Sequence, residues 1–399
     1  MINKMEHEIA ALEMVVLLIL LLCVIVWDNV ERVRWIPSSV IAVCLGMIVA
    51  AWTGTTDTPF VFAPELFLYL MLPVILLNSS FKFRPESLRR TWLSSMMFAW
   101  IGTLITIMLI AWGILTWMSM FDKNISIIDS LLIASLLAPT DTVATLMLSK
   151  SLDDTFIAEV IENEAVLNDA ISVVLVRLFA TMSTQHQQLN RWVPVRAVGI
   201  SVLFMCLSAA AGVVCARAVK KLNVEKPSIH FIVALIVYAV CEFVGISGIV
   251  GLFTYGSLVR PPKIVQETLE SVSVIIEAYV YLTIGLALHS YNTSMMCQSF
   301  LILLSCIVSR VIVVFSLGNC LRCCGRKQWT APSLLFFSMC GIRGAISFAM
   351  CMGLRSEWRD FIQSTAFVVI VSTIVCMGTL QKCMQKILIE PYKTLRPPI

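Results

Sequence analysis

The chain is a succession of apolar runs, each about as long as a helix that crosses a bilayer. A hydrocarbon core of roughly 30 Å is spanned by about 20 helical residues. Charged residues, prolines and glycines divide the chain into about thirteen such runs. They lie near 10–28, 36–52, 61–79, 91–119, 127–149, 155–183, 194–219, 228–243, 245–260, 264–290, 295–321, 329–354 and 361–389. Because backbone polar groups in lipid must be satisfied within the chain, the runs predict an all-α polytopic membrane protein.

The composition excludes a soluble domain and a nucleic-acid-binding protein. Of 399 residues, 59% are hydrophobic and only 14% are charged, whereas soluble domains carry far more charge. The 29 Lys and Arg residues are scattered singly between the runs, not gathered into the basic stripe that binds nucleic acid. The 14 Cys residues show no disulfide framework and no zinc spacing. Cys323 and Cys324, beside basic residues, are candidates for palmitoylation, with unmodified thiols as the alternative.

Loop charge predicts the orientation. The division between 228–243 and 245–260 is the weakest, and one bent helix there would invert the sides of everything downstream. With thirteen spans and an outer N-terminus, most Lys and Arg residues fall in inner loops, as the positive-inside rule requires. We therefore favour thirteen spans, a lumenal or outer N-terminus and a cytoplasmic C-terminus. Since no small-residue cleavage site follows the first apolar run, we expect that run to remain as a span.

Carboxylates inside the fifth and sixth runs indicate ion handling. The segment 162–175 reads ENEAVLNDAISVVL and contains Asp169, and the segment 138–144 reads APTDTVA and contains Asp141. A charged side chain at mid-membrane costs about +2.5 to 3.5 kcal/mol even on a forgiving scale, so a carboxylate retained there usually has a function. A single carboxylate that is accessible from one side of the membrane at a time can hold either a proton or a metal cation, but not both. Binding of one ion therefore requires release of the other, which amounts to exchange of the two ions. The alternative is that Asp169 forms a structural ion pair with Arg177 or another intramembrane arginine.

The fifth and twelfth runs are interrupted near their middles. Pro139 removes a backbone donor and is followed by polar residues that compete with the helix for hydrogen bonds. In the twelfth run, GIRGA (341–345) places glycines on both sides of Arg343. The two breaks correspond if spans 1–6 and 8–13 are inverted repeats, and such paired breaks mark a transporter site near the midplane. Thr140 would then offer a freed carbonyl to a cation, while Arg343 offsets the negative helix ends. The alternative is that both breaks are packing kinks.

Five segments carry these features in a fixed order. They are APTDTVA, ENEAVLNDAISVVL, FVGISGIVGLFTYGSLVRP (243–261), SVSVIIEAYVYLTIGLAL (271–288) and MCGIRGAISFAMCMGL (339–354). Together they resemble the sodium/proton exchangers of the cation:proton antiporter superfamily, over about 60–390. The resemblance implies one transporter domain, 1–399, that forms a homodimer of thirteen-helix subunits with two inverted six-helix repeats and crossed unwound helices. It also implies a moving core, about 91–183 and 295–389, and a dimerisation scaffold, about 10–79 and 194–290.

The resemblance assigns the cation site. Asp169 is expected to bind Na+ or H+ alternately, and Asn168 is its partner in the asparagine–aspartate motif typical of electroneutral, one-for-one exchangers. Thr140 and Asp141 are expected to complete the Na+ site.

Other charged positions match supporting residues of the family. Glu164 is expected to form a structural ion pair with Arg310, and Arg343 to compensate the charge of the unwound helix ends. Glu277 matches a further acidic residue on the tenth span.

The chain also departs from the family pattern. Ala165 stands where the family usually has a serine, and Asn78 where it has an aspartate. With fewer hard oxygen ligands, the choice between Na+ and K+ stays open. The long cytosolic regulatory tail of many animal exchangers is not expected, since the chain ends about ten residues after its last apolar run.

These features predict a secondary antiporter, not an enzyme, that needs no cofactor and exchanges Na+, and alternatively Li+ or K+, for H+. Its expected partners are these ions, membrane lipids and a second copy of the chain. Three alternatives remain. A K+/H+ exchanger shares every motif, a non-transporting sensor or scaffold would explain Ala165 and Asn78, and an intramembrane enzyme is disfavoured because no His residues stand at ligand spacing.

Overall fold

The computed structural model describes residues 15–27, 38–53, 64–82, 85–141, 155–184, 193–222, 226–259, 261–287, 295–325, 329–354, 356–377 and 380. Helices form nearly all of these ranges, and no β-strand occurs within them, which confirms the all-α class. The second half of the predicted fifth span, 142–150, and both chain ends lie outside the described residues.

Each predicted span contains at least one helix. The helices are Val15–Trp27, α2 (Ser38–Thr53), α3 (Pro64–Leu66), α4 (Leu72–Lys82), α5 (Pro85–Met96), α6 (Thr103–Met120), α7 (Ile127–Leu137), α9 (Thr155–Thr184), α10 (Val193–Lys221), α11 (Pro227–Val244), α12 (Gly248–Leu258), α13 (Lys263–Leu286), α14 (Met296–Cys323), α15 (Ala331–Met339), α16 (Ala345–Gly353) and α17 (Arg359–Ser372). Wider π-helical turns join α3 to α4 (Phe67–Met71), join α5 to α6 (Met97–Gly102) and follow α17 (Thr373–Met377). Six of the described helical stretches are long and apolar enough to cross a membrane by length and composition.

The weakest predicted division proves to be a true helix boundary. α11 ends where Gly245 adopts the left-handed conformation, with φ of 84°, which favours glycine because it has no Cβ. α12 begins with Ser247 as its N-cap, whose side chain accepts a hydrogen bond from the amide of Val250. Two separate helices therefore occupy 227–258, as the thirteen-span division predicts, and not the single bent helix of the alternative.

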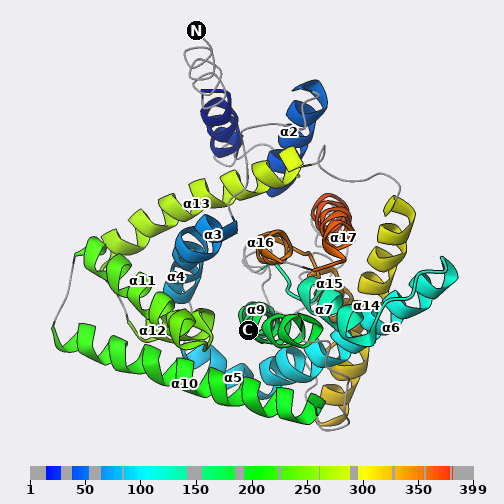
Figure 1. Cartoon of the computed structure of the whole chain (residues 1–399). Coiled ribbons are helices and arrows are strands. Elements are labelled where there is room, and N and C mark those ends of the chain that lie inside the picture. Colours follow the sequence, from blue (N-terminus) through cyan, green and yellow to red (C-terminus); the bar gives the residue numbers. More distant parts are fainter. Residues whose placement is uncertain are drawn as a thin grey trace, which may run out of the picture.

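The helices pack as two groups, visible on opposite sides of Figure 1. In the α13 group, α10, α11 and α12 pack on one another, and α13 packs along α2 and α4. In the α9 group, α5, α6, α7, α9 and α14 to α17 form a second set of close neighbours. Contacts between the groups are sparser. They run chiefly from α9 to α10 and α12, from α16 to α3, which precedes α4, and from α13 to α16 and α17. Asp141, which follows the break in α7, is hydrogen-bonded across this boundary to Tyr281 of α13.

Both predicted interruptions are present, and they touch. α7 ends at Leu137 and is followed by non-helical residues 138–141, and residues 340–344 separate α15 from α16. The amide of Asp141 donates to the carbonyl of Ile342 over 2.7 Å, which ties one unwound segment to the other. Gly344 permits this approach, because a Cβ there would lie 2.6 Å from Cγ of Asp141. The crossing therefore depends on proline in one segment and on glycine in the other.

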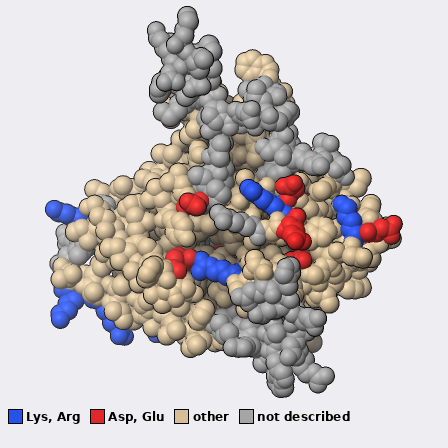
Figure 2. Space-filling view, viewed as in Figure 1, with Lys and Arg blue, Asp and Glu red and all other residues tan. Residues whose placement is uncertain are grey.

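The outer surface carries many large apolar side chains. Trp52, Trp112 and Phe243 are 87%, 69% and 93% exposed, respectively. On the face shown in Figure 2, charged side chains are few beside the uncharged surface. Such a surface suits lipid tails and would aggregate in water.

Candidate functional site

Asp169 lies on α9 and is fully buried, with 0% of its surface exposed. Neither carboxylate oxygen has a hydrogen-bond partner among the described residues. Arg177, two turns further along α9, forms an ion pair with Glu242 of α11 instead. The carboxyl group of Asp169 is therefore a buried acid without a hydrogen-bond partner in the described part of the chain.

Asn168 connects α9 to the end of α7. Its side-chain nitrogen donates to the carbonyl of Ala138 over 3.2 Å. Its oxygen accepts hydrogen bonds from the hydroxyls of Thr103 on α6 and Ser172 on α9, at 3.0 and 3.2 Å. With its donor and its acceptor both engaged, Asn168 holds α9 in a fixed rotation against the unwound segment. Asp169 follows directly, so its side chain is placed by the same contacts.

Arg343 sits at the C-terminal end of α7, where unpaired carbonyls give the helix end a negative character. Its guanidinium donates to the carbonyls of Ala138 and Pro139, and its amide donates to the hydroxyl of Thr373 over 3.1 Å. Only 1% of Arg343 is exposed. The charge of this arginine is therefore used to satisfy a broken helix end.

Glu164 and Arg310 form a two-pronged ion pair between α9 and α14. The guanidinium nitrogens of Arg310 lie 2.6 and 3.1 Å from the two carboxylate oxygens of Glu164. The ring of Phe337 lies below the guanidinium, 5.0 Å from it, at a distance where cation–π attraction operates. A Cβ on Gly341 would come within 3.0 Å of the Arg310 side chain. This pair joins α9, α14 and the α15–α16 link.

The buried charges do not balance. Among the described residues, the buried acids are Asp141, Glu164 and Asp169, whereas the buried arginines are Arg310 and Arg343. With every acid ionised, the cluster would carry one excess negative charge. An uncompensated charge in a low-dielectric interior is costly, so the cluster favours the uptake of one positive charge.

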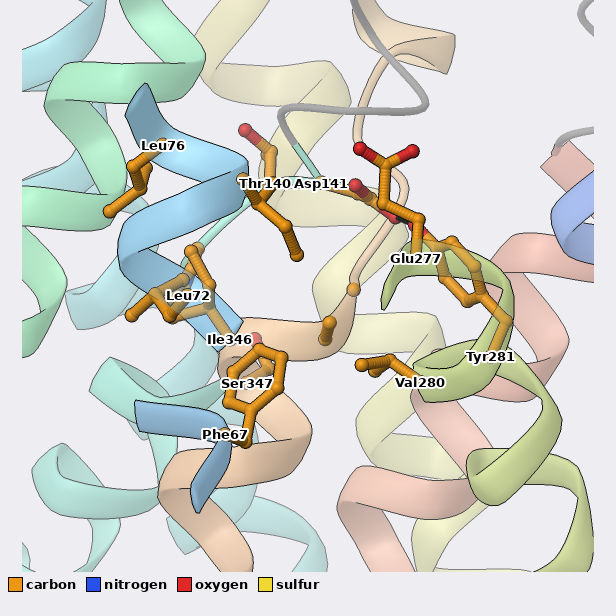
Figure 3. A pocket seen from close by; sticks show the side chains of 14 residues that line it. Phe67, Leu72, Leu76, Thr140, Asp141, Glu277, Val280, Tyr281, Ile346 and Ser347 are labelled. Atoms are coloured by element: carbon orange, nitrogen blue, oxygen red, sulfur yellow. Dashed lines mark hydrogen bonds between the residues drawn. The ribbon is translucent and has the colours of Figure 1, made fainter. Parts of the chain in front are cut away.

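A pocket reaches the crossing from the side of α13 (Figure 3). It is lined by Phe67, Leu72, Ile75, Leu76, Pro139, Thr140, Asp141, Glu277, Val280, Tyr281 and residues 344–347. Figure 3 shows Glu277 and Tyr281 extending from α13 toward Asp141. The hydroxyl of Tyr281 donates to Oδ2 of Asp141, and Oε1 of Glu277 accepts from Ser273 over 2.8 Å. Thr140 and Ser347 contribute buried hydroxyls that have no hydrogen-bond partner among the described residues.

The residues named from the sequence thus fall in three places. Thr140, Asp141 and Glu277 line the pocket, whereas Asn168 and Asp169 lie on α9 and are not among its lining residues. Glu164, Arg310 and Arg343 form the charged support around them. Of the two departures from the family pattern, Ala165 is 1% exposed and Asn78 is 8% exposed, and neither is among the residues that line the pocket.

Sequence reasoning missed the hydroxyl groups around the site, namely Thr103, Tyr281, Ser347 and Thr373. Tyr281 follows Glu277 by four residues, so helical periodicity could have placed both on one face. Thr103 and Thr373 adjoin π-helical turns. These turns frequently mark functional sites, but no sequence pattern announced them.

The chain matches known proteins over most of its length. Residues 17–386 match the family model described as "Sodium/hydrogen exchanger, transmembrane". Sodium/hydrogen exchanger 8 of Mus musculus is 26% identical over 403 aligned residues, which cover 91% of this chain and 69% of the relative. Sodium/hydrogen exchanger 1 of Arabidopsis thaliana is 26% identical over 71% of this chain and 57% of its own length.

The fold matches solved structures of the sodium proton antiporter MjNhaP1 from Methanocaldococcus jannaschii. One, solved at pH 8, has a TM-score of 0.70 and 17% identity, and it covers 94% of this chain and 96% of its own. Another, an electron-microscopy structure, has a TM-score of 0.77 and 16% identity, with 98% and 99% covered. The antiporter fold expected from the crossed helices is thereby confirmed. Given the family model that spans nearly the whole sequence, this chain belongs to the sodium/hydrogen exchanger family and is an integral membrane protein that crosses the bilayer several times.

Proposed function

We propose that the chain exchanges Na+ for H+ across a membrane by alternating access, with Asp169 as the shared site. The observation that carries this proposal is a fully buried carboxyl group that has no hydrogen-bond partner among the residues described, beside two crossed helix breaks. An ionised carboxylate left alone there would be strongly destabilising, so Asp169 must hold a proton or a metal cation. Since one carboxyl group cannot hold both ions, binding of one releases the other. The names of the relatives support sodium as the metal ion.

The charge balance supports an exchange of one Na+ for one H+. The buried acids exceed the buried arginines by one among the described residues, so either ion leaves the cluster neutral. Na+ prefers hard oxygen ligands, and in this proposal Asp141 and Thr140 supply them together with Asp169. Asn168 belongs to the same site as the residue that holds Asp169 in place, because its side-chain oxygen already accepts two hydrogen bonds. Glu164 and Arg310 neutralise each other's charge and have a structural role. Arg343 compensates the negative character of the C-terminal end of α7. Glu277, at the pocket, is a further acidic group on the route of the cation.

Exchange requires a change of shape, because Asp169 is not among the residues that line the pocket. The sparse contacts between the two helix groups mark the surface along which such a change would occur. The α9 group would move as the core, about 91–183 and 295–389. The α13 group, with the helix 15–27, would form the scaffold, about 10–79 and 194–290, of a homodimer. In this proposal the N-terminus faces the outside or a lumen and the C-terminus faces the cytoplasm.

The direct test is the substitution Asp169→Asn, which keeps the shape of the side chain and removes its charge. Na+-driven proton flux in proteoliposomes should fall to the background of empty vesicles, while the purified variant keeps its helical content. Asp360→Asn is the matched control, because Asp360 is exposed at the start of α17, and its flux should equal that of the wild type. Flux that persists in Asp169→Asn would refute the shared site.

A further inference from the structure

One hydrogen bond crosses from the α13 group to the unwound segment of the α9 group. Tyr281 lies on α13 and is 4% exposed, and Asp141, which is 6% exposed, follows the break in α7. The hydroxyl of Tyr281 donates to Oδ2 of Asp141. Figure 3 shows the two side chains meeting at the wall of the pocket. This bond therefore joins the two helix groups at the proposed cation site.

Each end of the bond is held by its own helix group. The backbone of Asp141 is tied to Ile342 over 2.7 Å, and Gly344 lies directly against its side chain. α13 is packed along α2, where Gly46 and Gly285 bring the two backbones together. A Cβ on Gly46 would meet Cα of Gly285 at 2.9 Å. Neither Asp141 nor Tyr281 can follow the other group if the groups move apart.

We propose that Tyr281 is a positioning residue that latches Asp141 to α13 in the conformation described and must release it during each transport cycle. The inference rests on the proposed function, because it is the exchange cycle that requires the two groups to move. A hydrogen bond weakens steeply once donor and acceptor exceed about 3.5 Å, so a displacement of even about 1–2 Å between the groups would break it. A bond to an ionised group shifts an equilibrium by roughly ten- to a hundredfold. Tyr281 therefore favours the latched conformation by about that factor over conformations in which the bond is absent.

The test compares Tyr281→Phe with Tyr279→Phe. Both variants lose one phenol hydroxyl from α13, and Tyr279 makes no side-chain hydrogen bond within the described structure. Hydrogen–deuterium exchange of the full-length protein reports local opening of each segment. Exchange in peptides covering 127–141 and 263–286 should accelerate in Tyr281→Phe by up to about a hundredfold, and it should match the wild type in Tyr279→Phe.

A second variant distinguishes the loss of this one hydrogen bond from a general destabilisation of the protein. Asp141→Asn weakens the same bond from the other side, so it should accelerate the same two segments, and the double variant should add little to either single one. The inference is overturned if Tyr281→Phe exchanges as the wild type does, if its acceleration spreads equally over α2 and α10, or if the two substitutions add fully. Na+-driven proton flux of the wild type is measured in parallel. Absence of that flux with localised acceleration would reject the proposed function, and with it the release in each cycle, and would leave only the bond of Tyr281 to Asp141 as a link between the helix groups. Normal flux without acceleration would reject the latch alone.

Discussion

Among single residues, the buried pair of Glu164 and Arg310 has the largest expected effect on stability. Both side chains are almost wholly buried, so removing one leaves the other charged and unpaired. Arg310→Ala should lower the free energy of unfolding by about 3–5 kcal/mol. Thermal unfolding in detergent would show this loss as a lower midpoint, and flux should fall along with the amount of folded protein.

The ion pair of Arg90 and Glu159 provides the comparison, because it also involves α9 but lies near the surface. Its side chains are 51% and 24% exposed, with a separation of 2.8 Å. Exposed pairs are screened by solvent and contribute about 0–1 kcal/mol. Arg90→Ala should therefore unfold close to the wild-type temperature. Equal losses of unfolding free energy in Arg90→Ala and Arg310→Ala would contradict the claim that burial decides how much each ion pair contributes to stability.

At the scale of elements, the site depends on the two interrupted spans, whose unwound segments 138–141 and 340–344 meet each other. The Gly344→Ala substitution tests this crossing, because the added Cβ would lie 2.6 Å from both Cγ and Oδ2 of Asp141. Overpacking of this kind costs about 1–3 kcal/mol, and displacement of a reacting group by about 1 Å can reduce a rate a hundredfold. We expect Na+-driven flux to fall by more than tenfold while most of the protein stays folded.

Gly199→Ala is the matched control for Gly344→Ala. Gly199 lies in α10 with no atom within 4 Å of the position a Cβ would take, so the alanine should be neutral or stabilise by up to about 1 kcal/mol. Flux assays on both variants, normalised to folded protein, would distinguish a specific effect of the added methyl group at the crossing from a general effect of replacing glycine by alanine. Wild-type flux in Gly344→Ala would show that Asp141 can move aside freely.

For the whole molecule, the proposed exchange predicts that the transported cation stabilises the folded protein. A ligand that binds only the native state stabilises it by about 2.7 kcal/mol at a hundred times its dissociation constant. NaCl should therefore raise the unfolding temperature above that in choline chloride at equal ionic strength. Lower pH should weaken the effect, because protons compete for the same carboxyl group. Asp169→Asn should show no difference between the two salts.

The same measurement separates the remaining alternatives. Stabilisation and flux with KCl but not with NaCl would identify a K+/H+ exchanger. Neither stabilisation nor flux with any alkali cation would favour a sensor or scaffold built on the exchanger fold.

The sequence alone determined the class and the places where the fifth and twelfth spans break. Bilayer thickness sets the length of an apolar run, and a proline inside a helix removes a backbone donor, as Pro139 does after α7, so these features are encoded locally. The carboxylate at Asp169 could be recognised in the same way, since an acid inside an apolar run stands out without knowledge of its neighbours. The boundary between α11 and α12 was the weakest division in the sequence, and the positions of Lys and Arg in the loops favoured it.

Only the tertiary structure decided which groups meet. Asp141 and Tyr281 are 140 positions apart, and Arg310 and Glu164 are 146 apart. The sequence pattern records which face of a helix is polar, but not which distant helix that face contacts. The Tyr281 bond and the hydrogen bonds from Arg343 to the carbonyls of Ala138 and Pro139 follow from packing between helices. So does the burial of the Asp169 carboxyl group away from any hydrogen-bond partner in the described ranges. That packing is set by the close fit of many side chains at once, a property no single segment contains.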